Sequence, residues 1–385
     1  MNYVYLSPHF PPNYLAFSQR LNELGVRVLG LADEPYEQLH PDLTAVLSEY
    51  YRVRDMHHYD DLLRALGYFT HQHGKIDRIE SHNEYWLETE ARLRTDFNVS
   101  GYKISDMPRI KRKSLMKRVF VEAGVPVAPG LLMQSAAEAR AFAAEMGYPI
   151  IAKPDIGVGA NETYKLHSAH ELEAFLARQP QGYLLEPFID GTIQSFDGLT
   201  DQDGRIVFHT VHQYGDGVLE IISQQLDAFY YSLRDIPPDL AEMGQRAVQA
   251  FGVRERFFHF EFFRQRDGSL IALEANLRPP GGFTTDMFNF ANNMDVYREY
   301  ANVVVDNRFE AGVERPYHCA YIARRQGKPY VHSHEDILAA FGERIAAHQP
   351  VTGIISVGMG NYGYLARSPF EEEIWEMADF IRRVR

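Results

Sequence analysis

The sequence of 385 residues predicts a protein of mixed α/β and α+β class, with an open parallel sheet first and α+β lobes after it. The opening is a β-α-β pattern, in which strands at 3–7 and 26–31 flank a helix at 13–24. Later, two aromatic-rich runs flank the dipeptide Asp267-Gly268 and predict a β-hairpin. Because the chain is too long for one ordinary core, we expect two or three domains or lobes.

Composition and charge argue against several classes of function. The chain has 39 basic and 52 acidic residues, a net charge of −13, which disfavours a general nucleic-acid or membrane-surface binder and favours a small-molecule partner. The start lacks the features of a signal peptide, and no run approaches the roughly 18 apolar residues of a membrane span, so we expect a cytoplasmic protein. Cys319 is the single cysteine of the sequence, which excludes an internal disulfide and a cysteine-based zinc site.

Two loops lie at the carboxyl ends of predicted strands, where parallel sheets bind ligands. The loop 7–12 contains no glycine, so its backbone cannot come close to a pyrophosphate, and a dinucleotide site is excluded there. The polar run 80–84 follows a strand near 76–80 and could contact a substrate. Ser81 or Asn83 could equally cap the next helix.

One basic cluster, at 109–118, stands out in this acidic chain. Apolar residues at helical spacing predict a helix here that stops at Gly124. Most of the charges would form a solvated face, and one or two could reach phosphates. The cluster consists of Arg109, Lys111, Arg112, Lys113, Lys117 and Arg118.

A glycine-containing loop follows a predicted strand that ends in Lys153. Gly157 and Gly159 would let backbone amides approach an anion closely, although the same Gly-Val-Gly sequence could equally be a plain hairpin turn. Capping boxes that begin at Ser135 and Ser168 predict a helix on either side of this region.

The run 183–189 is predicted as a strand that contains Glu186 and Pro187. Because proline removes a backbone donor, Pro187 indicates an edge strand or an irregular stretch. Such a strand would leave backbone groups free for a planar ligand.

The predicted hairpin brings two carboxylates together. Asp267-Gly268 favours a tight two-residue turn, and if Arg266 pairs with Ser269, Glu261 faces Glu274. Like charges directly opposite each other in an apolar stretch are destabilising, so a cation should lie between them.

The same face of the hairpin continues with polar side chains. Asn276 shares the face of Glu274, and Arg278 follows on that side if the chain stays extended. Two carboxylates, an amide oxygen and a guanidinium suit a Mg²⁺ ion and phosphate oxygens. The alternative is an exposed hairpin with acidic residues on its solvent face, which would leave His259 and Asn276 without a role.

The last segment, 300–385, is expected to complete the second α+β lobe. Its glycine-rich stretch at 353–363 could close over a substrate, although a turn between strands is the simpler interpretation.

Together these segments resemble the ATP-grasp superfamily over roughly residues 1–300. The resemblance rests most on Glu261 and the run Glu274-x-Asn276-x-Arg278-Pro279. It implies a Rossmann-like domain at 1–105, the small ATP-grasp lobe at 106–185, and the large lobe with a C-terminal extension at 186–385.

The resemblance also implies roles for single residues. Arg278 matches the substrate-facing arginine, and Ile193 stands where many relatives carry an acidic residue for the ribose. Arg278 and Lys153 would be catalytic. The implied magnesium ligands are Glu261, Glu274 and Asn276, and the implied nucleotide contacts are Lys113 and Lys153 to phosphates, Gly157 and Gly159 in the phosphate flap, Glu186 to the adenine amino group, and the chain around Phe188 to the ring.

The implied activity is ATP-dependent carboxylate–amine ligation, similar to that of L-amino acid ligases, with Mg²⁺ or Mn²⁺. A small carboxylic acid, an amino acid or peptide, would be activated as an acyl phosphate and joined to an amine, with release of ADP and phosphate. The resemblance allows for a homodimer and implies no nucleic acid or membrane. The alternatives are an ATP-dependent carboxylase of the biotin-carboxylase kind and a nucleotide-binding module that has lost its chemistry.

Overall fold

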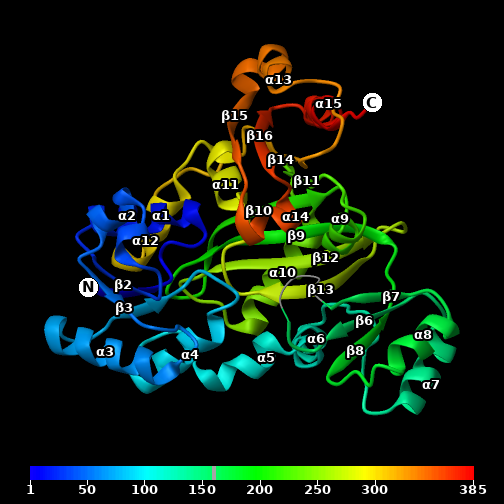
Figure 1. Ribbon diagram of the computed structural model, residues 1–385, viewed down its shortest axis with the longest axis horizontal. Coiled ribbons are helices and arrows are strands. Elements are labelled where there is room, and N and C mark those ends of the chain that lie inside the picture. The colour runs from blue at the N-terminus through cyan, green and yellow to red at the C-terminus, as the bar shows by residue number, and fades with distance from the viewer. Residues whose placement is uncertain (158–161) are drawn as a thin grey trace.

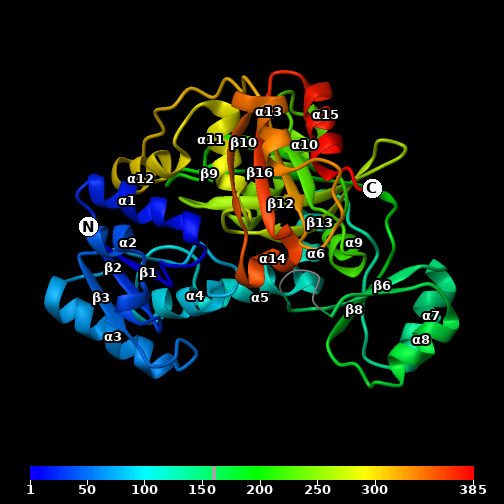
Figure 2. The ribbon, with the colours of Figure 1, turned by 45° about the horizontal axis from the view of Figure 1, so that its top comes forward.

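The computed structural model describes residues 1–157 and 162–385, and three sheets organise this part of the chain (Figure 1). A four-stranded sheet lies at the N-terminal end, an eight-stranded sheet forms the centre, and a second four-stranded sheet lies on the opposite side from the first (Figures 1 and 2). The predicted mixed class, with a parallel sheet followed by α+β segments, is confirmed.

The N-terminal sheet is parallel, with strand order β3-β2-β1-β4. The predicted β-α-β opening is confirmed. The helix Tyr59–His73 contains Gly67 and is followed by Gly74, whose φ of 86° ends it. The elements are β1 (Asn2–Leu6), η1 (Pro12–Tyr14), α1 (Leu15–Glu23), β2 (Arg27–Ala32), η2 (Tyr36–Gln38), α2 (Pro41–Val46), β3 (Glu49–Arg52), α3 (Tyr59–His73), β4 (Arg78–Glu80) and α4 (Leu87–Asp96).

The second four-stranded sheet is antiparallel, with order β5-β8-β6-β7. The Ser135 and Ser168 hydroxyls cap its two helices as predicted, each accepting a hydrogen bond from the backbone N–H three residues on. The elements of this region are η3 (Ile104–Asp106), α5 (Met107–Lys111), α6 (Lys113–Glu122), β5 (Leu131–Leu132), α7 (Ala136–Met146), β6 (Ile150–Pro154), β7 (Tyr164–Leu166), α8 (Ala169–Leu176) and β8 (Tyr183–Pro187).

Of the two interpretations of Pro187, an edge strand or an irregular stretch, the edge strand is wrong. Strand β8 lies inside its sheet, between β5 and β6. The short β5 pairs only with Leu184 and Leu185, so the missing N–H of Pro187 falls beyond the paired stretch on that side.

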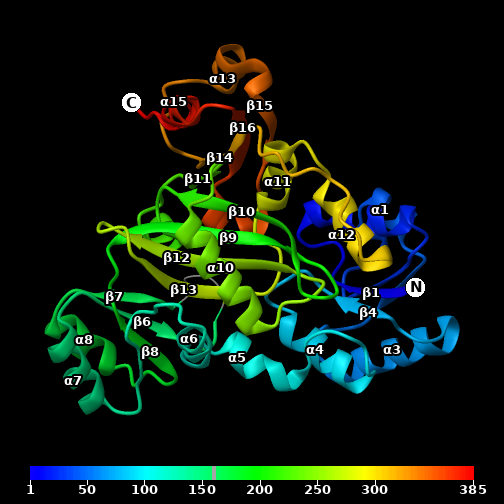
Figure 3. The same cartoon turned by 180° about the vertical axis from the view of Figure 1, so that it is seen from behind.

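The central sheet has eight antiparallel strands in the order β13-β12-β9-β10-β11-β14-β16-β15. Figure 3 shows α10 lying across β9 and β12, where Gly244 permits close contact with Phe196. Strands β14 to β16 extend the sheet that contains the predicted hairpin. The elements are β9 (Gly191–Thr200), β10 (Ile206–Tyr214), α9 (Val218–Ser223), β11 (Phe229–Ser232), α10 (Pro238–Phe251), β12 (Phe257–Gln265), β13 (Leu270–Asn276), α11 (Thr284–Asn292), α12 (Val296–Asp306), β14 (His318–Arg324), α13 (His334–Phe341), η4 (Gly342–Arg344), β15 (Ile345–Pro350), η5 (Gly353–Ile355), α14 (Ser356–Met359), β16 (Tyr362–Ser368) and α15 (Glu371–Arg382).

The β12–β13 hairpin has a different turn from the one predicted, yet the predicted pair is present. Gln265 N donates to Ser269 O at 2.9 Å, which leaves a three-residue loop with a left-handed Gly268 (φ 87°). A register shift after Glu261 offsets the additional turn residue. Glu261 therefore pairs with Glu274 as predicted, while the two-residue turn is wrong.

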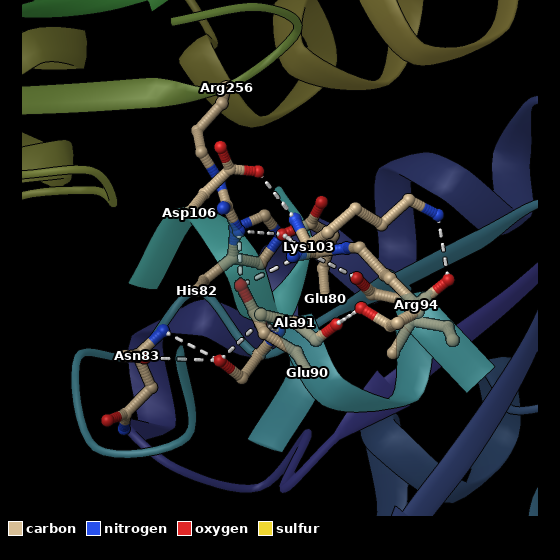
Figure 4. Close-up of polar contacts among 12 residues, drawn as sticks. Glu80, His82, Asn83, Glu90, Ala91, Arg94, Lys103, Asp106 and Arg256 are labelled. Atoms are coloured by element: carbon tan, nitrogen blue, oxygen red, sulfur yellow. Dashed lines mark hydrogen bonds and ion pairs between the residues drawn. The ribbon is translucent and has the colours of Figure 1, made fainter. Parts of the chain in front are cut away.

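A buried group of charges joins the N-terminal sheet to the central sheet (Figure 4). Arg256, which directly precedes β12, forms ion pairs with Glu80 at the end of β4 and Glu90 of α4. Arg94 Nη2 lies 2.8 Å from Glu80 and 3.0 Å from Glu90. Two arginines and two carboxylates thus neutralise each other at the junction.

The polar run 80–84 does not cap helix α4. Trp86 stands at the cap position, and its side chain makes no capping hydrogen bond. The Asn83 side chain accepts from Tyr85 N within the preceding loop, and Ser81 Oγ donates to Glu90. The capping interpretation of Ser81 and Asn83 is therefore wrong.

Within the described residues, no helix combines the length and the apolar character needed to cross a bilayer.

Candidate active site

A cavity of about 540 Å³ opens between the β5–β8 sheet, the β12–β13 hairpin and the loop after β4. It is lined by all but one of the residues that the sequence singles out for nucleotide, metal and substrate: Lys113, Lys153, Gly157, Glu186, Phe188, Glu261, Glu274, Asn276 and Arg278. The exception, Gly159, lies outside the described residues. Segments more than a hundred residues apart in the chain thus meet at one cavity.

The hairpin presents an oxygen-rich face to this cavity. Glu261 and Glu274 are paired across the ladder, and Asn276 follows on the same strand as Glu274. No group of three or more histidine, cysteine, aspartate or glutamate side chains in the described ranges is arranged to hold a metal. A hard cation would therefore be held by two carboxylates and one amide oxygen, with phosphate or water oxygens completing its coordination, and this donor set fits Mg²⁺.

Each carboxylate of the hairpin already has a cationic neighbour from the protein. Lys113 Nζ lies 3.1 Å from Glu274 Oε1, and His259 Nε2 lies 3.5 Å from Glu261 Oε1. Burial alone would raise the pKa of Glu261, but hydrogen bonding and the charge of His259 hold it below its usual value. The repulsion that the sequence predicts is thus relieved without a bound ion.

His259 is held by a buried aspartate. Its Nδ1 lies 2.5 Å from Asp197 Oδ1, and Asp197 Oδ2 contacts His212 Nδ1 at 2.7 Å and accepts from Ser195 Oγ at 2.6 Å. Burial lowers the pKa of His259, but Asp197 outweighs it and raises the pKa to about 9. The imidazole therefore carries a positive charge at neutral pH. The sequence singles out His259 but gives no indication of its partner on β9.

Two lysines converge on Glu186. Lys153 Nζ lies 2.7 Å from Glu186 Oε2, and Lys117 Nζ lies 2.6 Å from Glu186 Oε1. Burial would raise the pKa of Glu186, but the charges of Lys153 and Lys117 hold it below the usual value. Both oxygens of the carboxylate expected at the adenine amino group are thus engaged by lysines.

Lys117 is a site residue that the sequence interpretation missed. The sequence gives it no role of its own within the basic cluster, whereas its side chain is only 13% exposed and lines the cavity, and burial lowers its pKa. A signal was present, because Lys117 lies one helical turn after Lys113 and therefore on the same face of α6.

One end of the cavity has a partly apolar wall. Pro187, Phe188, Ile189 and Ile193 line it. Phe188 N donates to Pro149 O at 3.0 Å, and the Lys165 ammonium lies 3.4 Å from the centre of the Phe188 ring. The N–H of Phe188 is thus engaged inside the protein, and backbone contacts to a base would come from its neighbours.

The opposite end combines Arg278 with Glu84, the last residue of the polar run 80–84. Arg278 Nε lies 3.5 Å from Glu84 Oε2, and Lys111 Nζ lies 2.6 Å from Glu84 Oε1. Of the two carboxylates in that run, Glu84 lines the cavity and Glu80 belongs to the buried network.

The glycine-rich stretch 353–363 is more than a turn. It forms η5 and α14 between β15 and β16, and Met359 at the end of α14 lines the cavity. The Met359 side chain lies against Gly282, where an added Cβ would meet its Cε at 2.5 Å. The C-terminal segment therefore contributes one wall of the site.

Comparison with known proteins agrees with this architecture. The sequence model of the ATP-grasp domain family matches residues 146–286. The L-arginine-specific L-amino acid ligase of Bacillus subtilis is 26% identical over 242 residues, which cover 60% of this chain and 58% of that protein. The chain thus aligns with little more than half the length of this relative.

Solved structures show the same fold. The L-amino acid ligase from Bacillus licheniformis superposes with a TM-score of 0.77 and 15% identity, covering 98% of this chain and 95% of the other. The MgADP-bound biotin carboxylase domain of Hydrogenobacter thermophilus 2-oxoglutarate carboxylase gives a TM-score of 0.69 and 17% identity, covering 97% and 87%. The chain therefore matches the ATP-grasp domain family over residues 146–286 and shares its fold with these ligase and carboxylase structures over nearly its whole length.

Proposed function

We propose that this protein is an ATP-dependent carboxylate–amine ligase whose acid substrate is an amino acid or a peptide. The observation that carries the proposal is the convergence of Glu261, Glu274, Asn276 and Arg278 with two lysines at one cavity. A pure nucleotide binder has little use for an arginine placed directly after paired carboxylates. The likeness to L-amino acid ligases supports an amino-acid substrate.

The nucleotide would lie along the cavity with its base at the Pro187–Ile193 wall and its phosphates toward the hairpin. Lys113 and Lys153 would bind phosphate oxygens, and Gly157 would approach them through its backbone. Glu186 would act by holding Lys153 and Lys117 in place. Glu261, Glu274 and Asn276 would hold Mg²⁺, which when bound neutralises charge on the phosphates.

Arg278 would orient the substrate carboxylate for attack on the γ-phosphate. A carboxylate oxygen forms the new bond to phosphorus, ADP leaves, and the amine then displaces phosphate from the acyl phosphate. The fork of the guanidinium matches a planar carboxylate, so the protein acts mainly by position and charge.

We also propose a division of the chain at the sheet boundaries. Residues 1–105 would form the N-terminal unit and 106–187 the small lobe, with the large lobe after it. Placing the second boundary after Pro187, rather than at 185, keeps β8 whole within its sheet.

Trapping with hydroxylamine tests the activity, because hydroxylamine converts acyl phosphates to hydroxamates. Protein, ATP, Mg²⁺ and pools of amino acids should give hydroxamate and ADP, and Arg278→Ala should reduce the rate by about a hundredfold. Arg266→Ala is the matched control, since Arg266 is an exposed arginine at the tip of the same hairpin. ADP release with bicarbonate alone, or no turnover with any acid, would contradict the proposal.

A further inference from the structure

The turn that follows the hairpin is held by its carbonyl oxygens. Four consecutive carbonyls, those of residues 279–282, each accept a hydrogen bond from a side chain. The donors are Arg278 Nη1 to Pro279 O at 2.8 Å, Tyr14 Oη to Pro280 O at 3.1 Å, Thr284 Oγ1 to Gly281 O at 2.7 Å, and Asn13 Nδ2 to Gly282 O at 3.2 Å.

Two of these donors come from the other end of the chain. Asn13 and Tyr14 belong to η1, which follows the glycine-free loop after β1, and the Tyr14 bond spans 266 residues of sequence. Tyr14 is buried, with its ring against Phe17 at 5.3 Å. The loop that cannot bind a dinucleotide therefore leads directly to residues that reach the substrate end of the cavity.

The position of Asn13 is itself fixed. Its amide nitrogen also donates to Asp286 Oδ2 at 3.0 Å, and Asp286 Oδ1 accepts from Tyr297 Oη at 2.9 Å. A contact supported in this way restrains the turn more than a single mobile side chain would.

The turn offers few backbone donors, and the restraint fixes their direction. Pro279 and Pro280 have no N–H, so the N–H groups of residues 279–282 belong to Gly281 and Gly282. Both glycines line the cavity beside Arg278. With all four carbonyls tied to side chains, rotation of these peptide planes would break one or more hydrogen bonds.

We propose that Asn13 and Tyr14 are positioning residues for ligation, which hold the 279–282 turn so that Arg278 and the Gly281 and Gly282 amides face the reacting carboxylate together. This role rests on the proposed ligase function. Neither residue is expected to touch the substrate. Their loss should loosen the turn, so that the acyl phosphate is held less well and more of it is lost to water.

Two readouts test the role. Tyr14→Phe removes one oxygen and keeps the ring, and Asn13→Ala removes the amide. In both variants hydrogen exchange of the peptide that contains Gly281 and Gly282 should be faster than in the wild type. The hydroxamate formed per ADP should fall by about fivefold, as expected for one lost hydrogen bond, while KM for ATP changes by less than about twofold.

Tyr50→Phe is the matched control. It also removes a tyrosine hydroxyl that donates to a backbone carbonyl, Glu34 O at 2.6 Å, in the N-terminal sheet. This variant should leave both readouts at the wild-type value.

Unchanged exchange at the turn in Tyr14→Phe and Asn13→Ala would overturn the inference, and so would faster exchange with an unchanged hydroxamate-to-ADP ratio. Wild-type protein that forms no hydroxamate would overturn the proposed function and this role with it. Wild-type activity that both variants leave intact would overturn the role alone.

Discussion

Lys113 Nζ lies 3.1 Å from Glu274 Oε1, so a lysine suited to phosphates is paired with a carboxylate suited to a metal ion. The same ammonium also donates to Gly157 O at 3.2 Å, and its side chain is only 9% exposed. A metal ion bound by Glu274 would therefore compete with Lys113 for the same carboxylate. A nucleotide that draws Lys113 away would therefore release Glu274 for the metal.

Replacing Lys113 should change the affinities for metal and nucleotide in opposite directions. Without nucleotide, Lys113→Met should bind Mn²⁺ on the order of tenfold more tightly, because a competing positive charge is removed. Its affinity for ADP should fall by a similar factor. Electron paramagnetic resonance of free Mn²⁺ and calorimetric titration with ADP measure the two effects.

Lys153→Met provides the control for general electrostatics. Lys153 lines the same cavity but pairs with Glu186. This variant should also lose ADP affinity, with a much smaller gain for Mn²⁺. An equal gain in Mn²⁺ affinity in the two variants would show that Lys113 and the metal ion do not compete specifically for Glu274.

Glu186→Gln should weaken purine nucleotides without regard to the base. Because both carboxylate oxygens face lysines, the substitution disturbs Lys117 and Lys153, and affinities for ADP and IDP should fall together by about tenfold. Calorimetry with both nucleotides is the measurement, and the half-exposed Glu173→Gln is the control. If the affinity for ADP fell and that for IDP did not, Glu186 would instead be assigned to the adenine amino group.

Removing Arg256 should be costly to stability. Arg256→Met leaves Glu80 and Glu90 buried with Arg94 alone, and we expect a loss of about 3–5 kcal/mol in the free energy of unfolding. Arg140→Met breaks an ion pair whose side chains are about half exposed, and it should cost far less. Urea unfolding compares them, and similar losses in both variants would show that the network contributes little.

Asp286 should make the free energy of unfolding depend on pH. Burial raises its pKa to about 6, above the value near 3.9 of an unfolded chain. The native state therefore binds this proton more tightly than the unfolded state, and the stabilisation is lost as the pH rises from about 4 to about 6.

Asp286→Asn removes this titration. As the pH rises across that window, the wild type should therefore lose up to about 3 kcal/mol of unfolding free energy that the variant does not lose. Asp239→Asn is a control of opposite sign, because hydrogen bonds from Arg264 lower the pKa of Asp239. Parallel pH profiles for wild type and Asp286→Asn would contradict the expectation.

The parts of the site that the sequence predicts are those that depend on neighbours in the chain. Glu261 and Glu274 could be paired because a single turn links their strands, and the error in turn length was offset by the bulge after Glu261. Lys153 could be placed because it lies near the end of a strand that a glycine-containing loop follows. In each case alternation along a strand determines which way a side chain points.

The missed contacts cross long distances in the chain. Asp197 and His259 are 62 residues apart, and Tyr14 and Pro280 are 266 apart. Periodicity carries no information on which distant side chains meet. Lys117 is a different case, because the basic cluster alone does not indicate which of its charges face solvent and which line a cavity.

The buried charges around Arg256 have a consequence for how this chain can change over evolution. The strand that carries His259 and Glu261 begins one residue after Arg256, among carboxylates supplied by the N-terminal sheet. A relative that loses Glu80 or Glu90 should also replace Arg256, because two buried arginines would otherwise share a single carboxylate and destabilise the fold. Positions 80, 90 and 256 should therefore covary among homologues. The segment 146–286, which contains Arg256, should also be inherited together with the N-terminal segment whose carboxylates neutralise that charge.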